Sequence, residues 1–309
     1  TGRYNTGLGF NAGVGIVGGQ KNIAIGVKCL SSSDGDDDNI AIGYEALFYQ
    51  NAGDASTYNL AIGNLTGKHL ELGLKNTFVG HGAAQGTNGA GGANRLDGEK
   101  NTAIGYSAGY SMTTTAQLNT FLGSHAAFSN TTGYGNTALG QAAGYENLAS
   151  PNNVYIGYQA AARTRGSTGL NVTIGHKAMY NGHATYDQNI AHSNTVIGSY
   201  AMGENTDAAL TSARNCILGA YAGKEMLSSE DCVLAGYNAG VALTTGNENT
   251  IIGNYAGAGL TDNAGQTFIG FKSGNALVTG AEKNTLIGYN TGSLAFKSFN
   301  PNLLFLSSA

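Results

Sequence analysis

The five-residue phrase Asn-x-x-aliphatic-Gly recurs sixteen times along this chain, and this recurrence constrains the fold more than any other feature. Successive copies start mostly 17 or 18 residues apart, with longer intervals of 20, 25, 23 and 21 at four places. Clear copies run from Asn22 to Gly26, Asn39 to Gly43, Asn101 to Gly105, Asn136 to Gly140, Asn249 to Gly253 and Asn284 to Gly288. A fixed short period indicates one supersecondary unit stacked many times.

Each unit contains one clear strand pattern. We number the unit from its Asn, which is position 0. Positions 1 to 3 are mostly β-branched, aliphatic or aromatic, and Asn and Gly bound them, which indicates a short strand. Alternate residues of a strand point to opposite faces, so positions 1 and 3 share one face and position 2 shares the other with Asn and Gly. Both faces are largely apolar, and a strand buried on both sides needs two apolar neighbours. One is the opposite wall of its own coil, and we expect another copy of the chain to supply the second. The residues that suggest this second contact are Ala24, Ala41, Phe78, Phe121, Phe268 and Leu286.

The rest of the unit predicts a thin coil. A small residue follows at position 7 in nearly every unit, which marks a place where the second wall approaches the first. Seventeen residues leave room for two short strands and two turns, and for no helix. The repeated Gly supplies turn conformations with positive φ, and stacked Asn side chains can form ladders between coils. Asp231 and Gln266 stand in for Asn in two units, and the unit at Asp231 reaches its glycine one residue late, at Gly236. These residues are expected to build the rod and to perform no chemistry.

Composition excludes several classes of function. The 309 residues include 49 Gly and no Trp, which is unusual for a compact enzyme. Only 11% of residues are charged and the net charge is −4, so neither a nucleic-acid-binding stripe nor a basic membrane patch is indicated. No stretch approaches eighteen consecutive apolar residues, so we expect no membrane insertion. The chain begins at Thr1 without Met, so we expect a fragment or a processed product.

Few residues suggest chemistry, and we expect neither catalysis nor a cofactor or metal. Residues 34–38 form an acidic turn, and Glu45 at the twelfth place superficially resembles a calcium loop, but Asn39 occupies the place where that loop needs Gly. His183 and His192 fall within one insertion and could approach each other, but a metal site needs further ligands, so none is expected here. The acids form no recurrent pair of the kind that glycoside hydrolysis requires. Cys216 and Cys232 read as the same repeat position in adjacent coils, where two free thiols are favoured over a disulfide.

The insertions are the candidate recognition sites. Residues 84–100, 179–193 and 203–214 interrupt the repeat, and binding residues concentrate on such loops. The alternative is length variation without a function. The side chains most suited to a polar or carbohydrate receptor are Arg95, Tyr180, His183 and Tyr186. Rings also recur at position 5, where packing at the coil corner is favoured over a platform that stacks on sugars: Phe10, Tyr44, Tyr106, Tyr158, Phe271 and Tyr289.

The repeats resemble those of two protein families. The runs Asn101-Thr-Ala-Ile-Gly-Tyr-Ser-Ala-Gly109 and Asn284-Thr-Leu-Ile-Gly-Tyr-Asn-Thr-Gly292 are similar to the repeats of phage tail-fibre proteins. They also resemble the repeats in the head domains of trimeric autotransporter adhesins. The similarity covers residues 5–292 and is specific for fold more than for function. Both families imply homotrimers in which three parallel β-rolls pack around one axis. The adhesin repeat is shorter than this one, which favours the tail fibre.

The sequence therefore predicts an all-β solenoid, a parallel β-roll of about sixteen coils of 17 to 18 residues, assembled as an intertwined or side-by-side homotrimer. Residues 1–292 form the shaft, and 293–309 form a cap or a junction to a following domain. The predicted function is a structural and adhesive component of a phage tail fibre, located in the virion. Its partners would be other fibre or baseplate proteins and a host cell-surface glycan or protein receptor. A bacterial trimeric surface adhesin head and a self-assembling extracellular filament subunit are the alternatives. An ice-binding solenoid is disfavoured, because Thr102, Thr120 and Thr137 alternate with apolar residues and Val154 and Val172 interrupt the series.

Overall fold

The computed structural model describes residues 2–53, 56–86, 95–165, 169–180, 191–203, 209–276 and 283–292, and the backbone of 304–306. The chain divides into two compact units, residues 1–152 and 153–309. Both units consist of the same kind of coil, and we number each coil by its strand. The residues that the structure describes contain no helix.

Each coil of the repeat contributes one strand of three residues. Unit 1 contains β1 (Thr6–Leu8), β2 (Ile23–Ile25), β3 (Ile40–Ile42), β4 (Leu60–Ile62), β5 (Thr77–Val79), β6 (Thr102–Ile104), β7 (Thr120–Leu122) and β8 (Thr137–Leu139). Unit 2 contains β9 (Val154–Ile156), β10 (Val172–Ile174), β11 (Thr195–Ile197), β12 (Cys216–Leu218), β13 (Val233–Ala235), β14 (Thr250–Ile252), β15 (Thr267–Ile269), β16 (Thr285–Ile287) and β17 (Leu304–Leu306).

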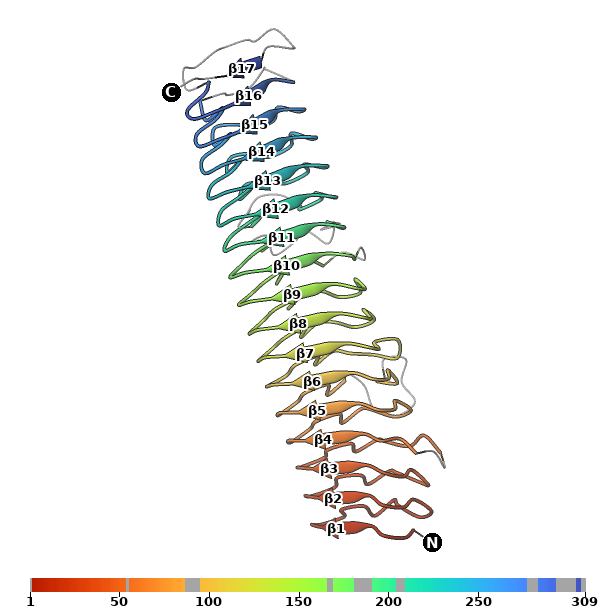
Figure 1. The fold of residues 1–309 in the computed structure, drawn as a ribbon. Helices are drawn as coiled ribbons and strands as arrows, with labels where there is room; N and C mark the ends of the chain where they lie inside the picture. The colour runs from red at the N-terminus through yellow and green to blue at the C-terminus, as the bar shows by residue number, and fades with distance from the viewer. Residues whose placement is uncertain are drawn as a thin grey trace. The chain divides into compact units, whose positions relative to one another are not determined.

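The strands of each unit stack in chain order into a parallel sheet (Figure 1). The register is the same at every step: Thr102 pairs with Thr120 and Ile104 with Leu122, and in unit 2 Thr250 pairs with Thr267. Residues at the same repeat position therefore form straight columns along the stack. The predicted all-β solenoid with a period of about 17 residues is confirmed.

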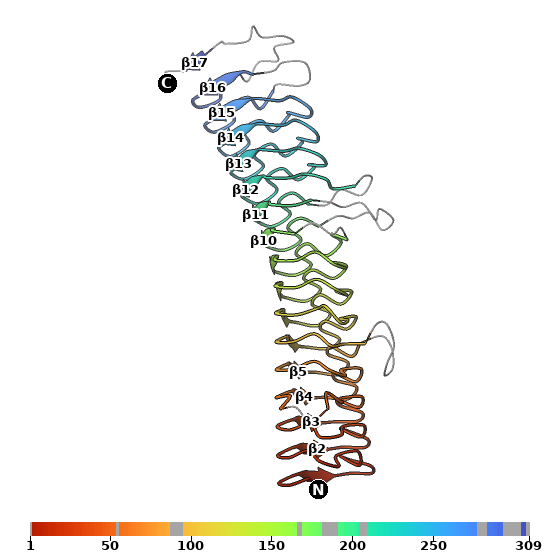
Figure 2. The same ribbon diagram turned by 90° about the vertical axis from the view of Figure 1, so that its right-hand side faces the viewer.

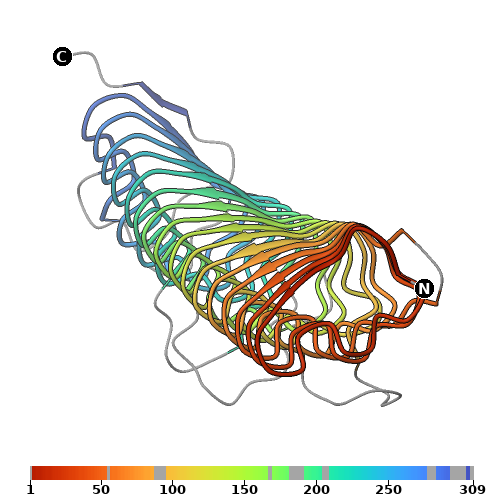
Figure 3. The ribbon, with the colours of Figure 1, turned by 90° about the horizontal axis from the view of Figure 1, so that it is seen from below.

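The second wall of the coil differs from the prediction. From Gly105 onward, coil 6 runs through a series of turns and forms no second strand, and its neighbours do the same. Backbone hydrogen bonds still join these turns from coil to coil. Gly109 N–H donates to the carbonyl of Ala126 at 2.9 Å, and Ser111 N–H donates to Phe128 at 3.0 Å. The coil outline, with its single strand, can be followed along the stack in Figure 3. Turns suffice here because their backbone groups bond to the turns of the neighbouring coils.

The middle residue of each strand from β2 to β16 is buried inside its own coil. Ala103 and Phe121 are completely buried, whereas Thr102 and Ile104 beside them are half-exposed. This corrects one step of the sequence argument. The residues that suggested contact with another chain are all core residues of their own coils: Ala24, Ala41, Phe78, Phe121, Phe268 and Leu286. The strand face left open to a partner is the one formed by positions 1 and 3.

The core is filled by small residues at position 7 and by residues of matched size at positions 2 and 8 of adjacent coils. Position 7 is fully buried in most coils, as predicted, for example at Ala108. Each aromatic residue at position 2 is matched by glycine at position 8 of the preceding coil. A Cβ on Gly109 would lie 2.9 Å from Cδ2 of Phe121, and one on Gly67 would lie 3.1 Å from Cδ2 of Phe78. Volume is therefore balanced between adjacent coils, as close packing requires.

The predicted Asn ladder is present. The side-chain oxygen of Asn101 accepts the backbone N–H of Asn119 at 3.1 Å, and its amide nitrogen donates to the carbonyl of Ala116 at 2.8 Å. The first bond joins neighbouring coils, and the second closes the coil on itself. The same pair of bonds recurs in unit 2, where Asn215 bonds Cys232 N–H and Ser229 carbonyl, each at 2.9 Å. Asn is suited to this place because one planar amide supplies both an acceptor and two donors.

The structure gives one repeat unit a different register from the one predicted. Cys232, and not Asp231, occupies the ladder position, because its N–H bonds the Asn215 side chain and its strand pairs Val233 with Cys216. The unit then has no extra residue, and its glycine falls in register. The two cysteines do not share a position: Cys232 is buried and Cys216 is exposed, and both are free thiols, as is Cys29. Gln266 does replace Asn as predicted, accepting Asn284 N–H at 3.1 Å.

Restoring asparagine at this position is expected to stabilise unit 2. The thiol of Cys232 makes weak sulfur hydrogen bonds, to the carbonyls of Glu230 at 3.3 Å and Gly246 at 3.4 Å and from Asn249 N–H at 3.5 Å. In Cys232→Asn an amide would replace the last two, and we expect a gain of about 1 kcal/mol in unfolding free energy. Denaturant unfolding monitored by circular dichroism measures the change. Cys232→Ala is the control and should lose stability; an unchanged midpoint in the Asn variant would contradict the ladder assignment.

Candidate functional site

The side chains at positions 1 and 3 form what we call the outer strand face. No residue on it is charged, and position 3 is aliphatic in every coil. None of these position-3 side chains is buried: Leu8, Ile25, Ile42, Ile62, Val79, Ile104, Leu122 and Leu139 in unit 1, and Ile156, Ile174, Ile197, Leu218, Ala235, Ile252, Ile269 and Ile287 in unit 2. Exposure is 66% at Leu8 in the first coil, 44% at Leu122 and 53% at Leu218. An exposed apolar strip of this length marks an interaction surface.

Departures from the 17-residue period avoid this face. Coil 5 is regular through Gly86, ten residues past its Asn, and it is in register again where Leu96 pairs with Leu70. Coils 10 and 11 are back in register by His192 and Ala213, two residues before the next Asn. The strands occupy one edge of the coils in each unit (Figure 2). The half of the coil that carries the outer strand face is thus uninterrupted in both units.

Threonines on the outer strand face bear on the ice-binding alternative. Thr77, Thr102, Thr120 and Thr137 occupy four consecutive coils and point outward, because the Ala and Phe residues beside them point into the core. The alternation of Thr with apolar residues along the sequence is therefore no argument against a flat array. The aliphatic column at position 3 remains, and Val172 replaces Thr on the same face of unit 2. The face is more apolar than a threonine array.

The predicted receptor-binding residues fall in different surroundings. Arg95 forms ion pairs with Asp97 and, at 3.6 Å, with Glu71, so its guanidinium is engaged within coils 4 and 5. The hydrogen bond to Asp97 raises the pKa of Arg95. Tyr180 is half-buried, with Lys177 Nζ 5.1 Å from its ring centroid. His183 and Tyr186 lie outside the residues that the structure describes.

The acidic turn at residues 34–38 serves folding contacts. Asp36 is buried and accepts hydrogen bonds from the Ser33 hydroxyl at 3.0 Å and from Ala52 N–H at 2.9 Å. Burial raises the pKa of Asp36. Glu45, the last residue of the loop pattern, pairs instead with Lys68 at 2.8 Å. Within the described part of the chain, no three His, Cys, Asp or Glu side chains are grouped to hold a metal ion.

Unit 2 carries a continuous row of aromatic rings just beyond the strands. We call this row the aromatic ladder. One ring comes from each of coils 9 to 16: Tyr158, His176, Tyr200, Tyr221, Tyr237, Tyr255, Phe271 and Tyr289. Successive centroids lie 5.0 to 6.3 Å apart. Sequence reasoning missed the three rings at position 6, and it missed Tyr237 because it counted that unit from Asp231. Counting one ring per coil at either position would have revealed all four.

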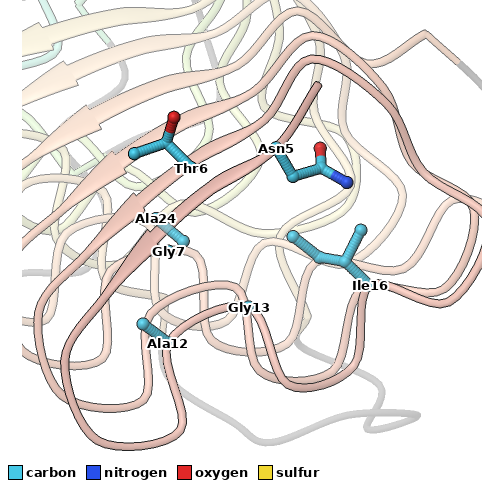
Figure 4. Close-up of a pocket in the computed structure, with 7 residues that line it drawn as sticks. All are labelled: Asn5, Thr6, Gly7, Ala12, Gly13, Ile16 and Ala24. Carbon is cyan, nitrogen blue, oxygen red and sulfur yellow. The ribbon is translucent and has the colours of Figure 1, made fainter. Parts of the chain in front are cut away.

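A small cavity opens at the N-terminal coil of unit 1. Its volume is about 130 Å³, and Asn5, Thr6, Gly7, Ala12, Gly13, Ile16 and Ala24 line it (Figure 4). It exists because coil 1 has glycine at both positions 2 and 8, Gly7 and Gly13, and faces the small Ala24 of coil 2. Its lining carries no titratable group, so the cavity offers packing space and no chemistry.

No protein-family profile matches the chain, and no curated protein or solved structure matches it. Among the described residues, no helix is long and apolar enough to cross a membrane. The candidate sites are therefore surfaces, the outer strand face and the aromatic ladder, and their geometry suits extended contact with a periodic partner.

Proposed function

We propose that this protein is a structural and adhesive component of a phage tail fibre, in which three copies pack through their outer strand faces. The observation that carries the proposal is the outer strand face itself, which is uncharged, has an aliphatic column at position 3 and is uninterrupted within each unit. A fibre needs a long, regular shaft, and a solenoid whose coils repeat in register supplies one. The similarity of the repeats to tail-fibre sequences supports the same function.

A second copy of the chain is the partner that fits this face. The side chains on the face repeat once per coil, at the spacing of adjacent strands, about 4.8 Å. Only a partner with the same period keeps its side chains in step along the whole face, and another copy of this chain has that period. Closed cyclic symmetry would bury the face in every copy and leave none exposed. Three copies around one axis would also place three sets of insertions on the outside.

The location of the protein would then be the virion, with baseplate or other fibre proteins at its ends and a cell-surface receptor along its side. A bacterial trimeric adhesin head and an extracellular filament remain alternatives that share the same assembly. Neighbouring genes separate them, since baseplate genes support the fibre and a membrane anchor encoded downstream supports the adhesin.

The assembly is tested by placing charge on the outer strand face. Ile62 and Leu122 are 37% and 44% exposed, so lysine at both sites leaves the core untouched. In an assembled trimer the same lysines would be buried without partners, which is strongly unfavourable. We expect the parent protein to sediment with three times the chain mass, and Ile62→Lys/Leu122→Lys to sediment as a single chain with an unchanged circular dichroism spectrum.

A matched control carries the same charge elsewhere in unit 1. Leu72 and Leu148 are 40% and 38% exposed and lie outside the strands, so Leu72→Lys/Leu148→Lys should remain trimeric. A parent protein that sediments as one chain at every concentration would refute the trimer. A trimer that survives lysine on the outer strand face would place the interface on another surface.

A further inference from the structure

Each of coils 9 to 16 supplies one ring to the aromatic ladder of unit 2, and the fold alone does not require this. Each coil has one ring at its corner, at position 5 or at position 6 and never at both. Where position 5 is Ser199, Ala220 or Asn254, position 6 is tyrosine. Where position 5 carries the ring, position 6 is Gln159, Lys177, Asn238, Lys272 or Asn290. The ring is thus present in all eight coils although the position that supplies it changes.

Coil stacking does not require these rings. Coils 2, 4 and 8 of unit 1 have no ring at position 5 or 6, yet they make the same backbone bond at the corner. Lys28 N–H donates to Phe10 at 2.9 Å and Leu65 N–H donates to Tyr44 at 2.8 Å, compared with 2.9 Å from Tyr221 to Ser199 in unit 2. Six of the eight ladder rings are exposed, by 42% at Tyr237 and 37% at Tyr255, and Tyr200 and Tyr221 are half-buried. A feature kept in every coil, largely exposed and unnecessary for stacking points to contact with something outside the coil.

The chemistry of the ladder suits a neutral, hydroxyl-rich chain. Six of the eight rings are tyrosines, which present an apolar ring and a hydroxyl together. Their neighbours at the corner include the amides of Gln159, Asn238 and Asn254, and none of the sixteen corner residues of these coils is acidic. Only two are lysines, so the ladder lacks the cationic density that a nucleic acid backbone requires.

We propose that the aromatic ladder binds an extended neutral glycan chain lying along the stack of coils. This deepens the proposed function, because it identifies the surface and the receptor class through which the fibre adheres. Successive rings are stacked in three pairs and edge-to-face in the others, so the ladder presents both ring edges and ring faces. Pyranose rings offer apolar C–H groups to these edges and faces, and hydroxyl groups to the amides and phenols. Each ring contributes a weak contact, and eight contacts in a row act together on one chain, as linked binding modules do.

Alanine in the middle of the ladder tests the proposal. Tyr237 and Tyr255 are adjacent rings with centroids 5.4 Å apart, and both are exposed, so Tyr237→Ala/Tyr255→Ala should fold normally. The probes are hydroxyethyl cellulose, xyloglucan and galactomannan in affinity gel electrophoresis, followed by titration with a disaccharide and a hexasaccharide of the polysaccharide that retards the protein most. We expect retardation by at least one of them, tighter binding of the hexasaccharide, and at least a tenfold loss of affinity in the variant.

Two further variants separate ring contact from other effects. Tyr58→Ala/Tyr134→Ala removes two tyrosines of similar exposure, 53% and 44%, that lie away from any coil corner, and it should bind like the parent. Tyr237→Phe/Tyr255→Phe keeps the rings and should retain most of the binding. Absence of retardation by all three polysaccharides, or equal retardation of the alanine variant, overturns the proposal. If the alanine variant instead loses its oligomeric mass, the ladder is a contact between copies and the proposal also falls.

These outcomes are independent of the assembly test. Glycan binding is measured on purified protein and does not require three chains, whereas the lysine variants of the outer strand face change mass without touching the ladder. If the protein assembles but binds no glycan, the proposed fibre assembly stands and the proposed glycan receptor is refuted. If the protein binds glycan as a single chain, the proposed role of the aromatic ladder stands and the proposed trimer is refuted.

Discussion

Replacement of Gly105 by alanine is expected to separate the coils of unit 1 around β6. Gly105 has φ of +137°, and a Cβ there would lie 2.5 Å from the carbonyl oxygen of Gly123 in the next coil. Backbone strain of this kind costs about 1–3 kcal/mol before the clash is counted. The clashing atom belongs to the backbone of a stacked coil and cannot rotate away. We expect unfolding free energy to fall by roughly 3–5 kcal/mol, the range reserved for severe core or backbone defects.

Hydrogen exchange would locate this defect. Protection should be lost first at the amides that join coil 6 to coil 7, such as Gly123 N–H, which donates to Ile104 at 2.9 Å. Gly53→Ala is the matched control, because Gly53 has φ of +67° and nothing within 4 Å of its Cβ position. Gly53→Ala should lower the unfolding free energy by only about 1–2 kcal/mol, the usual penalty for a non-glycine residue in a left-handed conformation. Equal losses for the two variants would show that stacking of the glycine column is not what requires Gly105.

Replacement of Asn101 by alanine should lower the unfolding free energy about as much as Gly105→Ala, for a different reason. The buried Asn101 side chain accepts from Asn119 N–H and from the Asn119 amide, and donates to Asn76 and to the carbonyl of Ala116, over 2.8 to 3.2 Å. Alanine removes all four bonds and leaves buried backbone groups without these partners. Each orphaned buried group costs about 1–3 kcal/mol, so we expect a loss of roughly 3–5 kcal/mol.

The control for the ladder is an exposed asparagine in the same unit. The side-chain oxygen of Asn64 accepts Tyr44 N–H at 2.9 Å, and water can replace it, so Asn64→Ala should cost less than about 1 kcal/mol. Denaturant unfolding of both variants, with exchange measured at Asn119 N–H, distinguishes them. If Asn101→Ala were no worse than Asn64→Ala, the Asn ladder would contribute nothing beyond an ordinary surface hydrogen bond.

The repeat by itself determined the fold class, the period of the coils and, outside the unit at Cys232, their register. This is because one short period, repeated sixteen times, leaves a single economical way to pair strands. It also determined the local reasons for its invariant residues. Asn is the side chain that can bond both a neighbouring coil and its own, and Gly is the residue that fits a positive φ under a stacked carbonyl, as Asn101 and Gly105 illustrate. The narrow core at position 7 followed from its small residues in the same way.

The tertiary structure decided what depends on contacts between coils. Two apolar strand faces look alike in sequence, and only the closed coil shows that Phe121 lies inside and Leu122 outside. The ladder position of Cys232 could not be read from its neighbours, because Asp231 is the better chemical match to Asn and only the pairing with Asn215 settles the register.

The aromatic ladder, likewise, can be recognised only in the folded structure. Tyr237 and Tyr255 occupy different repeat positions and come within 5.4 Å of each other because position 6 is in the left-handed conformation, with φ of +59° at Tyr255. A one-dimensional pattern records side-chain identity at each position. The direction in which a side chain leaves the backbone, and therefore which rings meet, is set by φ and ψ in the folded coil.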